Sequence, residues 1–427
     1  MTKEILTSKR TGDSCIHLKH SSGLDIYICE MQGFSGIEAL IGTKYGSVNT
    51  MFKTAADSEY TTVPEGIAHF LEHKLFENED CGVFELYAGT GAMCNAFTSF
   101  DKTCYLFSCS KNYEENLKIL LEFVQKPYFT KENVEKEMGI IGQEIQMTND
   151  NPEWRVFFNM LECMYHAHPV KTDIAGTLDS ISMIDAPLLY KCYDTFYNLN
   201  NMVLSIAGNI SADKVLEICD KYLKPCENKG LETVFPDEPD SIVSSEIREK
   251  QQIGASIFNI GYKCRTAKGI EQLKLVTAAS AASSLLTDPA LPMYDRLLKE
   301  GTINSTFCGE VFYGEGYFSV IFSGESESPD TVRSALTDEI QRLITEGINE
   351  KDFQRIKKSA YGSLVRELNN VEAVSNLMLN SHMENVSPYA SIDVLSELTS
   401  DDVLSFIKQE LHSDRCVLSV IEKEDNP

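Results

Sequence analysis

The sequence has few of the features that mark membrane, secreted or disulfide-rich proteins. Its longest apolar runs, such as 278–286, are too short and too rich in serine to span a bilayer. The amino terminus reads MTKEILTSKRTGDSC, with no apolar stretch after its basic residues, so we expect no signal peptide. The thirteen cysteines are an odd number, scattered singly, with no C-x-x-C pair. Such thiols suit a reduced protein better than a disulfide framework, and we therefore expect a cytoplasmic protein with no membrane partner.

Positive charge is also scarce. Lys and Arg total 38 against 64 Asp and Glu, which gives a formal net charge of −26. A nucleic-acid-binding surface needs clustered positive charge, so we expect no nucleic-acid partner. The acidic excess has two interpretations: it attracts basic peptides to an acidic chamber, or it only keeps the surface soluble.

The segment 224–249 has the composition of a linker, with three prolines, many acidic residues and few large apolar ones. It separates residues 1–223 from residues 250–427, which we interpret as two domains. The two are similar near their ends, because a helically spaced apolar run precedes the strand-like segment 202–206 and another precedes 416–420. These segments align without a gap, which indicates two copies of one α+β unit, although short amphipathic segments can also be similar by chance.

Alternating and helically spaced apolar residues predict the local structure. The expected strands are 38–47, 92–99 and 102–110. The expected helices are 63–77, 114–125, 131–147, 152–165 and 350–368.

The most informative motif is His69-x-x-Glu72-His73 in the first expected helix. The histidines are four residues apart and so lie on one helical face, where two imidazoles can bind one tetrahedral metal ion. Glu72 borders that face and is placed to accept a proton from water instead of binding the metal. This order of residues is the inverzincin signature. The alternative is a solvated helix with two incidental histidines.

The start of this helix also has a pattern. Thr62 and Glu65 have capping-box spacing, and Pro64 suits a first helical turn, so we expect the helix to begin there.

A catalytic zinc site usually needs a third protein ligand, and the helix 131–147 offers two candidates. Glu137 and Glu144 are seven residues apart and lie almost in register beside an apolar stripe. Gly139 and Gly142 lower helix propensity there, which suggests that another backbone packs closely. Without the histidine motif, both acids would be interpreted as surface charges.

His166 and His168 are a weaker metal motif. One intervening residue points the two side chains apart on a helix, and Pro169 suggests a helix end, so we favour a structural role.

These residues together resemble the pitrilysin/insulinase family of metallopeptidases, and most of all its shorter, processing-peptidase-like members. The resemblance rests on four motifs in the first half of the chain: Gly66-x-x-His69-x-Leu71-Glu72-His73-x-x-Phe76, the segment 95–99, Glu137-x6-Glu144, and the segment 173–177. It implies an α+β fold of two related α/β-sandwich halves, each an antiparallel sheet with helices on one face, in a clam-like arrangement.

The resemblance also implies the parts of a catalytic site. Zn²⁺ would be the cofactor, with His69, His73 and Glu144 as ligands, Glu72 as general base and Glu137 as a second acid supporting the site. An extended peptide substrate would add to the strand that contains Asn95, Ala96, Phe97 and Thr98, through main-chain hydrogen bonds.

One departure from the family pattern bears on assembly. The family commonly places an Arg and, seven residues later, a Tyr in the second half, and both face the substrate. This sequence has Arg296 but Ile303 at the second position. We therefore expect a zinc endopeptidase or processing peptidase that works with a second family member as a heterodimer, or as a homodimer; Tyr313 or Tyr317 could instead replace the missing Tyr. The rival hypothesis is a non-catalytic scaffold or peptide-binding subunit.

Overall fold

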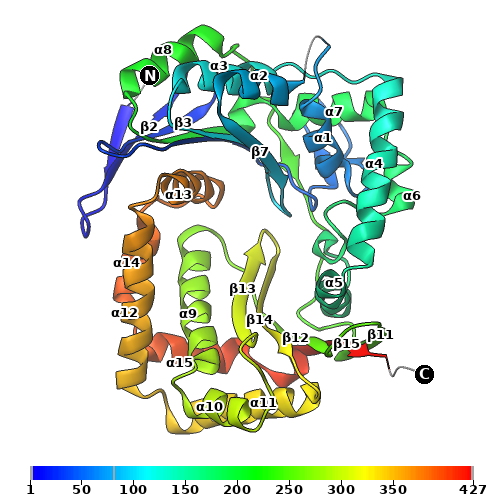
Figure 1. Cartoon of the computed structure of the whole chain (residues 1–427), viewed down its shortest axis with the longest axis vertical. Helices are drawn as coiled ribbons and strands as arrows, with labels where there is room; N and C mark the ends of the chain where they lie inside the picture. Colours follow the sequence, from blue (N-terminus) through cyan, green and yellow to red (C-terminus); the bar gives the residue numbers. More distant parts are fainter. Residues whose placement is uncertain (1–2, 80–81, 425–427) are drawn as a thin grey trace. The chain divides into compact units, whose positions relative to one another are not determined.

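The computed structural model describes residues 3–79 and 82–424, which form two compact units (Figure 1). The first unit comprises Met1–Ile145, Asp173–Phe235 and Leu364–Tyr389, and the second comprises Gln146–Thr172, Pro236–Ser363 and Ala390–Pro427. Each unit therefore includes a segment from the opposite half of the sequence. No helix within the described residues is long and apolar enough to cross a membrane.

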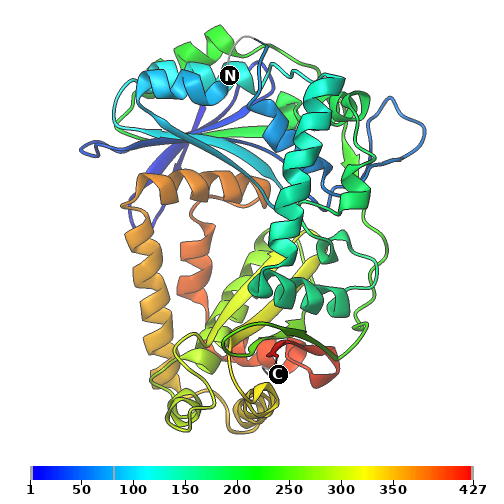
Figure 2. The same ribbon diagram turned by 45° about the vertical axis from the view of Figure 1, so that its right-hand side comes forward.

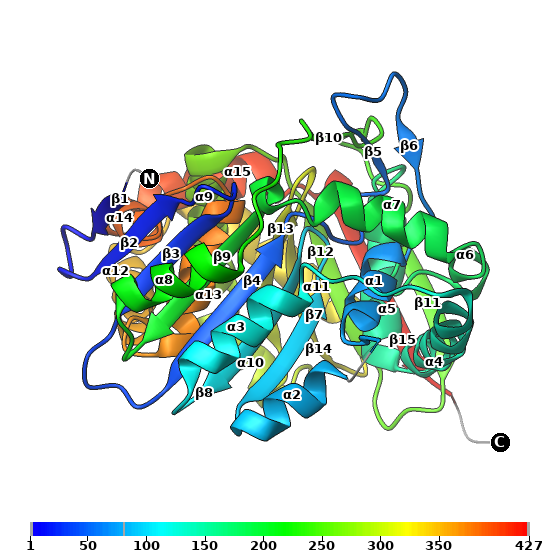
Figure 3. The same ribbon diagram turned by 90° about the horizontal axis from the view of Figure 1, so that it is seen from above.

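The first unit is built on a seven-stranded sheet with the order β1-β2-β3-β9-β4-β8-β7 (Figure 3). The pair β3/β9 is parallel, and the other neighbouring strands are antiparallel. A smaller sheet has the order β10-β5-β6. The strands are β1 (Lys3–Thr7), β2 (Ser14–Lys19), β3 (Asp25–Glu30), β4 (Ile37–Thr43), β5 (Met51–Lys53), β6 (Thr61–Thr62), β7 (Met93–Thr98), β8 (Thr103–Cys109), β9 (Met202–Gly208) and β10 (Glu232–Thr233).

Helices cover both faces of this sheet. Three helices, α2, α3 and α8, lie on one face and α13 lies on the other (Figures 1 and 2). The helices of the unit are α1 (Ile67–Leu75), α2 (Val83–Thr90), α3 (Tyr113–Phe123), α4 (Lys131–Asn149, within the unit as far as Ile145), α6 (Leu178–Ile181), α7 (Ala186–Phe196), α8 (Ala212–Tyr222) and α13 (Val371–Met383), with a short 3-10 helix, η2 (Leu199–Asn201).

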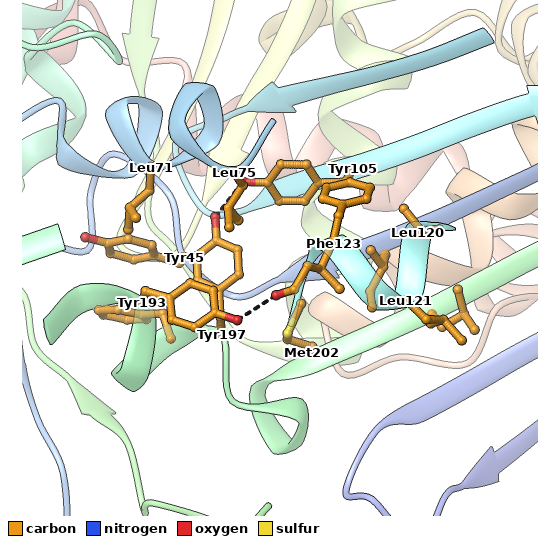
Figure 4. Packing of buried hydrophobic residues seen from close by; sticks show 14 of the residues in the cluster. Tyr45, Leu71, Leu75, Tyr105, Leu120, Leu121, Phe123, Tyr193, Tyr197 and Met202 are labelled. Atoms are coloured by element: carbon orange, nitrogen blue, oxygen red, sulfur yellow. Dashed lines mark hydrogen bonds between the residues drawn. The ribbon is translucent and has the colours of Figure 1, made fainter. Parts of the chain in front are cut away.

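A single apolar core joins these layers. Figure 4 shows part of it, in which Leu71 and Leu75 of α1 lie near Tyr105, Tyr197 and neighbouring aliphatic side chains. The hydroxyl groups of Tyr105 and Tyr197 are 2.8 Å apart and satisfy each other inside the core. The metal-motif helix is therefore anchored through its apolar face.

The second unit repeats this arrangement with a five-stranded sheet, β11-β15-β12-β14-β13. Its strands are β11 (Glu246–Gln251), β12 (Ile257–Lys263), β13 (Cys308–Gly314), β14 (Tyr317–Glu325) and β15 (Cys416–Lys423). Its helices are α5 (Pro152–Met164), α9 (Gly269–Thr287), α10 (Pro292–Lys299), α11 (Pro329–Glu346), α12 (Glu350–Glu367), α14 (Ala390–Glu397) and α15 (Ser400–Glu410), with the 3-10 helices η1 (Pro169–Lys171) and η3 (Ser413–Arg415).

The strand order confirms the internal repeat. In both units the strands of the repeat lie in the order first, last, second, fourth, third, and the first and last strands are parallel. The predicted alignment of 202–206 with 416–420 corresponds to β9 and β15, the same position in each sheet. Equivalent glycines follow from it, because Gly42 in β4 lies opposite Val203 and Gly261 in β12 lies opposite Val417.

These two glycines allow a helix from the other half of the sequence to pack closely. A Cβ on Gly42 would lie 3.0 Å from the Met383 side chain of α13. A Cβ on Gly261 would lie 2.5 Å from the Met160 sulfur of α5. The first sheet is therefore covered by α13, which follows its strands in the sequence, and the second sheet is covered by α5, which precedes its strands.

The α+β class and the two related halves are confirmed, and two details of the predicted halves are corrected. Each sheet has one parallel pair, because the first and last strands of the repeat, β3 and β9 or β11 and β15, run side by side in the same direction. Helices cover both faces of the first sheet instead of one, because α13 comes from the distant segment 364–389.

The segment after Pro236 is tied to the second unit by a buried lysine. The ammonium group of Lys263 contacts the Glu238 carboxylate at 2.6 Å and the carbonyl oxygens of Met164, Pro239 and Ser241. Glu238 also accepts the backbone N–H groups of 166–168. This network satisfies a buried charge pair that would be costly if either partner were lost.

Candidate metal centre and active site

The two histidines of the motif lie on one face of α1, as the four-residue spacing predicts. Their ring centroids are 4.6 Å apart. His69 is buried and His73 is partly buried, while Leu71 and Leu75 on the opposite face enter the core. The amphipathic character of α1 therefore fixes the direction in which both imidazoles point.

The start of α1 differs from the prediction. Thr62 belongs to β6, and the helix begins after Gly66, whose φ of 84° is left-handed and whose helix start has no side-chain cap. The expected capping box is therefore wrong. A Cβ on Gly66 would lie closer than 3.0 Å to the Ala175 carbonyl oxygen, and one on Gly176 would also lie closer than 3.0 Å to the Glu65 carbonyl oxygen. The loop 173–177 thus packs backbone to backbone against the entry to the helix.

The predicted helix 131–147, which is α4, brings two acids to the histidines. A Glu137 oxygen lies 2.9 Å from His73 Nδ1, within hydrogen-bond distance. The Glu144 oxygens lie 3.7 Å from His69 Nε2 and 3.7 Å from His73 Nε2. The expectation that a backbone packs against Gly139 and Gly142 is wrong, since among the described residues Gly139 has open space and Gly142 meets only a side-chain atom of Leu178.

The donor set suits a metal ion. Glu137 accepts the Nδ1–H of His73, which leaves the Nε2 lone pair of that ring facing Glu144. One donor atom each from His69, His73 and Glu144 lies within 4.8 Å of the others. The 3.7 Å separations from Glu144 are too long for hydrogen bonds but near the about 3.4 Å expected between ligands bound at about 2.1 Å around a tetrahedral ion.

The electrostatics of the group agree with this assessment. Burial lowers the pKa of His69 to about 4, so this ring is neutral near pH 7. Burial also opposes charge on His73, but the hydrogen bond to Glu137 and the nearby carboxylates outweigh it and raise the pKa. The carboxylates therefore favour a positive charge between the two rings, as a bound cation would provide.

Glu72 is buried beside this group. The Thr98 hydroxyl donates a 2.8 Å hydrogen bond to one of its carboxylate oxygens. Burial raises the pKa of Glu72, although the bond from Thr98 and the charge of His73 act in the opposite direction. A carboxylate with a raised pKa and a fixed orientation is suited to general-base chemistry.

The predicted peptide-binding strand is β7, which contains Asn95, Ala96, Phe97 and Thr98. Within the described ranges it pairs with β8 alone and ends the order of the sheet. Its other edge has no neighbouring strand among the described residues, so an extended segment can add to it through main-chain hydrogen bonds. Thr98, at the carboxyl end of β7, hydrogen-bonds to Glu72. The sequence did not predict this contact, because no sequence pattern pairs residues that lie on separate elements.

The remaining predicted residue, Arg296, belongs to the second unit. It lies exposed on α10 and pairs with Glu300 at 3.3 Å. Ile303 is buried in the same unit, with 3% of its surface exposed. It therefore serves as a core residue and has no polar group to offer a substrate.

Two other histidine groups do not resemble the first. His168 accepts the Val170 N–H through Nδ1, and its Nε2 lies 3.0 Å from the Glu315 carbonyl oxygen, so both nitrogens serve the fold. His17, Asp25 and His382 also bring donor atoms within 4.8 Å. Asp25, however, already contacts His17 at 3.0 Å and the Lys19 ammonium at 2.6 Å, which leaves it less suited to a cation.

Comparison with known proteins identifies the family of the chain. Residues 56–178 match insulinase (peptidase family M16), and residues 184–360 match the peptidase M16 inactive domain. YmfH of Bacillus subtilis (strain 168), named an uncharacterized zinc protease, is 36% identical over 425 residues, which cover 96% of this chain and 97% of the relative. The crystal structure of a putative M16-like peptidase from Alicyclobacillus acidocaldarius has a TM-score of 0.93 and 30% identity, with 99% of each chain covered. A protease from Helicobacter pylori has the same fold, with a TM-score of 0.83, 18% identity and 99% of each chain covered. The chain therefore belongs to the insulinase family, peptidase family M16, and is similar to its zinc proteases.

Proposed function

We propose that this protein is a zinc-dependent endopeptidase whose active site is the group formed by α1, α4 and the end of β7. The observation that carries the proposal is the convergence of the donor atoms of His69, His73 and Glu144 beside a buried Glu72. A non-catalytic subunit would have no need to keep a carboxylate with a raised pKa next to an intact donor set.

Each residue of the site has a distinct task in this proposal. His69, His73 and Glu144 would hold Zn²⁺, which supplies Lewis acidity for water activation and for polarising a carbonyl group. Glu137 fixes the His73 ring in the tautomer whose Nε2 is free to ligate. Glu72 accepts the proton of the attacking water at its carboxylate and returns it to the leaving amine. Thr98 holds Glu72 in orientation for both transfers.

The edge of β7 would hold the substrate. An extended peptide that adds to this edge forms main-chain hydrogen bonds, which give affinity with little sequence choice. Because β7 ends at Thr98, which contacts Glu72, a peptide bound along Asn95–Thr98 runs toward the catalytic carboxylate. We also assign the protein to the cytoplasm, since the twelve cysteines within the described residues are all free.

The test compares the purified chain with Glu72→Gln and Glu144→Gln variants. Peptide cleavage is followed by mass spectrometry on a peptide mixture, and zinc content by elemental analysis. Glu72→Gln should retain zinc and thermal stability while turnover falls by about 10²–10⁴-fold, as expected on loss of a general base. Glu144→Gln should bind zinc more weakly. Glu135→Gln, an exposed acid of α4, is the matched control and should change neither. Cleavage by Glu72→Gln at the wild-type rate would move the chemistry to another site.

A second candidate, a peptide-binding subunit that depends on a partner, is favoured by the buried Ile303. Loss of one donor to the developing oxyanion typically costs about 10²–10³-fold in turnover. We therefore propose that a second family member supplies the Arg/Tyr pair. Adding such a homologue should raise turnover of this chain, whose molar mass in solution is measured alone and in the mixture. Full activity of the chain by itself, unchanged in Arg296→Ala, would contradict the two-chain arrangement.

A further inference from the structure

A fully buried lysine stands directly behind the metal site. Lys74 follows His73 on α1, and its side chain has 0% of its surface exposed. Burial of an ammonium group is expensive unless charged or polar partners surround it. The ammonium contacts the Glu77 carboxylate, the Asn133 carbonyl oxygen at 3.3 Å and a Glu137 oxygen at 3.8 Å. Two of these three partners lie on α4, the helix that also supplies Glu144.

The contacts of Glu137 show what this lysine can do. One carboxylate oxygen faces His73 Nδ1 at 2.9 Å, and the other faces the Lys74 ammonium at 3.8 Å. Adjacent residues of α1 therefore face the two oxygens of one carboxylate, His73 through a hydrogen bond and Lys74 through a longer charge contact. This arrangement restricts rotation of the carboxylate and keeps the first oxygen directed at His73.

Lys74 also bridges the two helices. The Asn133 carbonyl and the Glu137 side chain are four residues apart, so they lie on one face of α4 with the ammonium between them. The carboxylate of Glu144 lies two turns further along the same helix, 3.7 Å from both imidazoles. The third donor is thus carried by the helix that Lys74 contacts.

We propose that Lys74 is a positioning residue of the metal site, which acts through Glu137 to orient His73 for zinc. This inference rests on the proposed zinc-binding function. Loss of a partner outside the ligand set typically weakens metal affinity by about 10- to 100-fold. Lys74→Met keeps the length and apolar character of the stem but removes the charge that holds Glu137.

The experiment measures zinc affinity of the full chain by competition with a chelator. Lys74→Met should bind zinc about 10- to 100-fold more weakly than the wild type. Lys136→Met is the matched control, because Lys136 also pairs with Glu77 but is exposed; it should bind zinc as the wild type does. In a Glu137→Gln background, Lys74→Met should cause little further loss, since the residue through which it acts is already changed.

Two results would overturn the proposal: wild-type zinc affinity in Lys74→Met, or an equal loss with and without Glu137→Gln. If Lys74→Met does not fold, Lys74→Arg is the substitute, and it should keep zinc affinity within a few-fold because it keeps the charge. If a folded Lys74→Arg variant binds zinc 10-fold or more weakly than the wild type, the proposal is also overturned, because a loss of that size is expected when the supporting contact is missing altogether.

A metal-free measurement separates this inference from the proposed function. At about pH 9, where imidazole is neutral, ¹⁵N chemical shifts of the His73 ring should report the Nδ1–H tautomer in the wild type and a mixture in Lys74→Met. A wild type that binds no zinc would refute the metalloenzyme, whereas an unchanged tautomer in Lys74→Met would refute the role of Lys74.

Discussion

The contact between Gly66 and the loop 173–177 predicts that one methyl group will damage the metal site from outside it. Gly66→Ala places a Cβ closer than 3.0 Å to the Ala175 carbonyl oxygen, in a residue whose φ is 84°. The left-handed conformation alone costs an L-residue roughly 1–2 kcal/mol. Moving the backbone carbonyl adds strain of similar size, so we expect a total loss of about 2–4 kcal/mol.

Gly139→Ala is the matched control, because the same methyl group enters open space within the helix α4. Removing a helical glycine should stabilise this helix by about 0.5–1 kcal/mol. The same Gly→Ala substitution at these two positions beside the metal site should therefore change stability in opposite directions.

The assay must report on the first unit. The only tryptophan, Trp154, lies in α5 of the second unit, so its fluorescence does not follow unfolding around α1. Hydrogen exchange measured by mass spectrometry on peptides covering 63–76 gives the local value. A loss of 2–4 kcal/mol corresponds to about 30- to 700-fold faster exchange, since each 1.4 kcal/mol is a factor of ten. Exchange in Gly66→Ala as slow as in the wild type would refute the argument from backbone contact.

Two further predictions concern buried charges. Lys263→Met leaves Glu238 buried without its ammonium partner and should destabilise the second unit by about 3–5 kcal/mol, measured by urea unfolding followed by Trp154 fluorescence. The control is Lys274→Met: Lys274 forms an exposed ion pair with Glu271, and its loss should change stability by less than about 1 kcal/mol. Burial and the charge of Glu372 raise the pKa of Glu38 in β4 to about 7. Because this value exceeds the ordinary 4.5, the free energy of unfolding should fall as pH rises from about 4.5 to about 7. Glu38→Gln should therefore stabilise the first unit at pH 8 but not at pH 4. The measurement is hydrogen exchange of peptides that cover β4. A Glu38→Gln variant with an unchanged pH profile would contradict this account.

The parts of the site that sequence could predict are those fixed by helical periodicity. The spacing of His69 and His73 predicted their common face, and the seven-residue spacing of Glu137 and Glu144 placed both acids on one side of α4. Periodicity says nothing of which helix meets which, so the contact of Glu137 with His73 required the structure. The buried position of Lys74 was equally hidden, because a lysine after a metal motif is ordinarily interpreted as exposed.

The fold shows the same division. The similarity of 202–206 and 416–420 was visible because both segments are short and local, and it predicted equivalent strands. The order of strands was not visible, since neighbours in the sheet such as β3 and β9 are far apart in the chain. The capping-box prediction failed for a related reason: the start of α1 is fixed by Gly176, more than a hundred residues later, and not by Thr62.

The cover of the first sheet by α13 has a consequence for biosynthesis. The last strand of that sheet, β9, ends at Gly208, but α13 ends at Met383, 175 residues later. At the about 5–20 residues per second of translation, this interval lasts about 10–35 s. Throughout this interval, the sheet face that contains Gly42 lacks α13, the helix that later covers it. The nascent chain thus cannot complete its amino-terminal unit until almost all of the polypeptide has left the ribosome, and during that time it is a natural client for chaperones that shield apolar sheet surfaces.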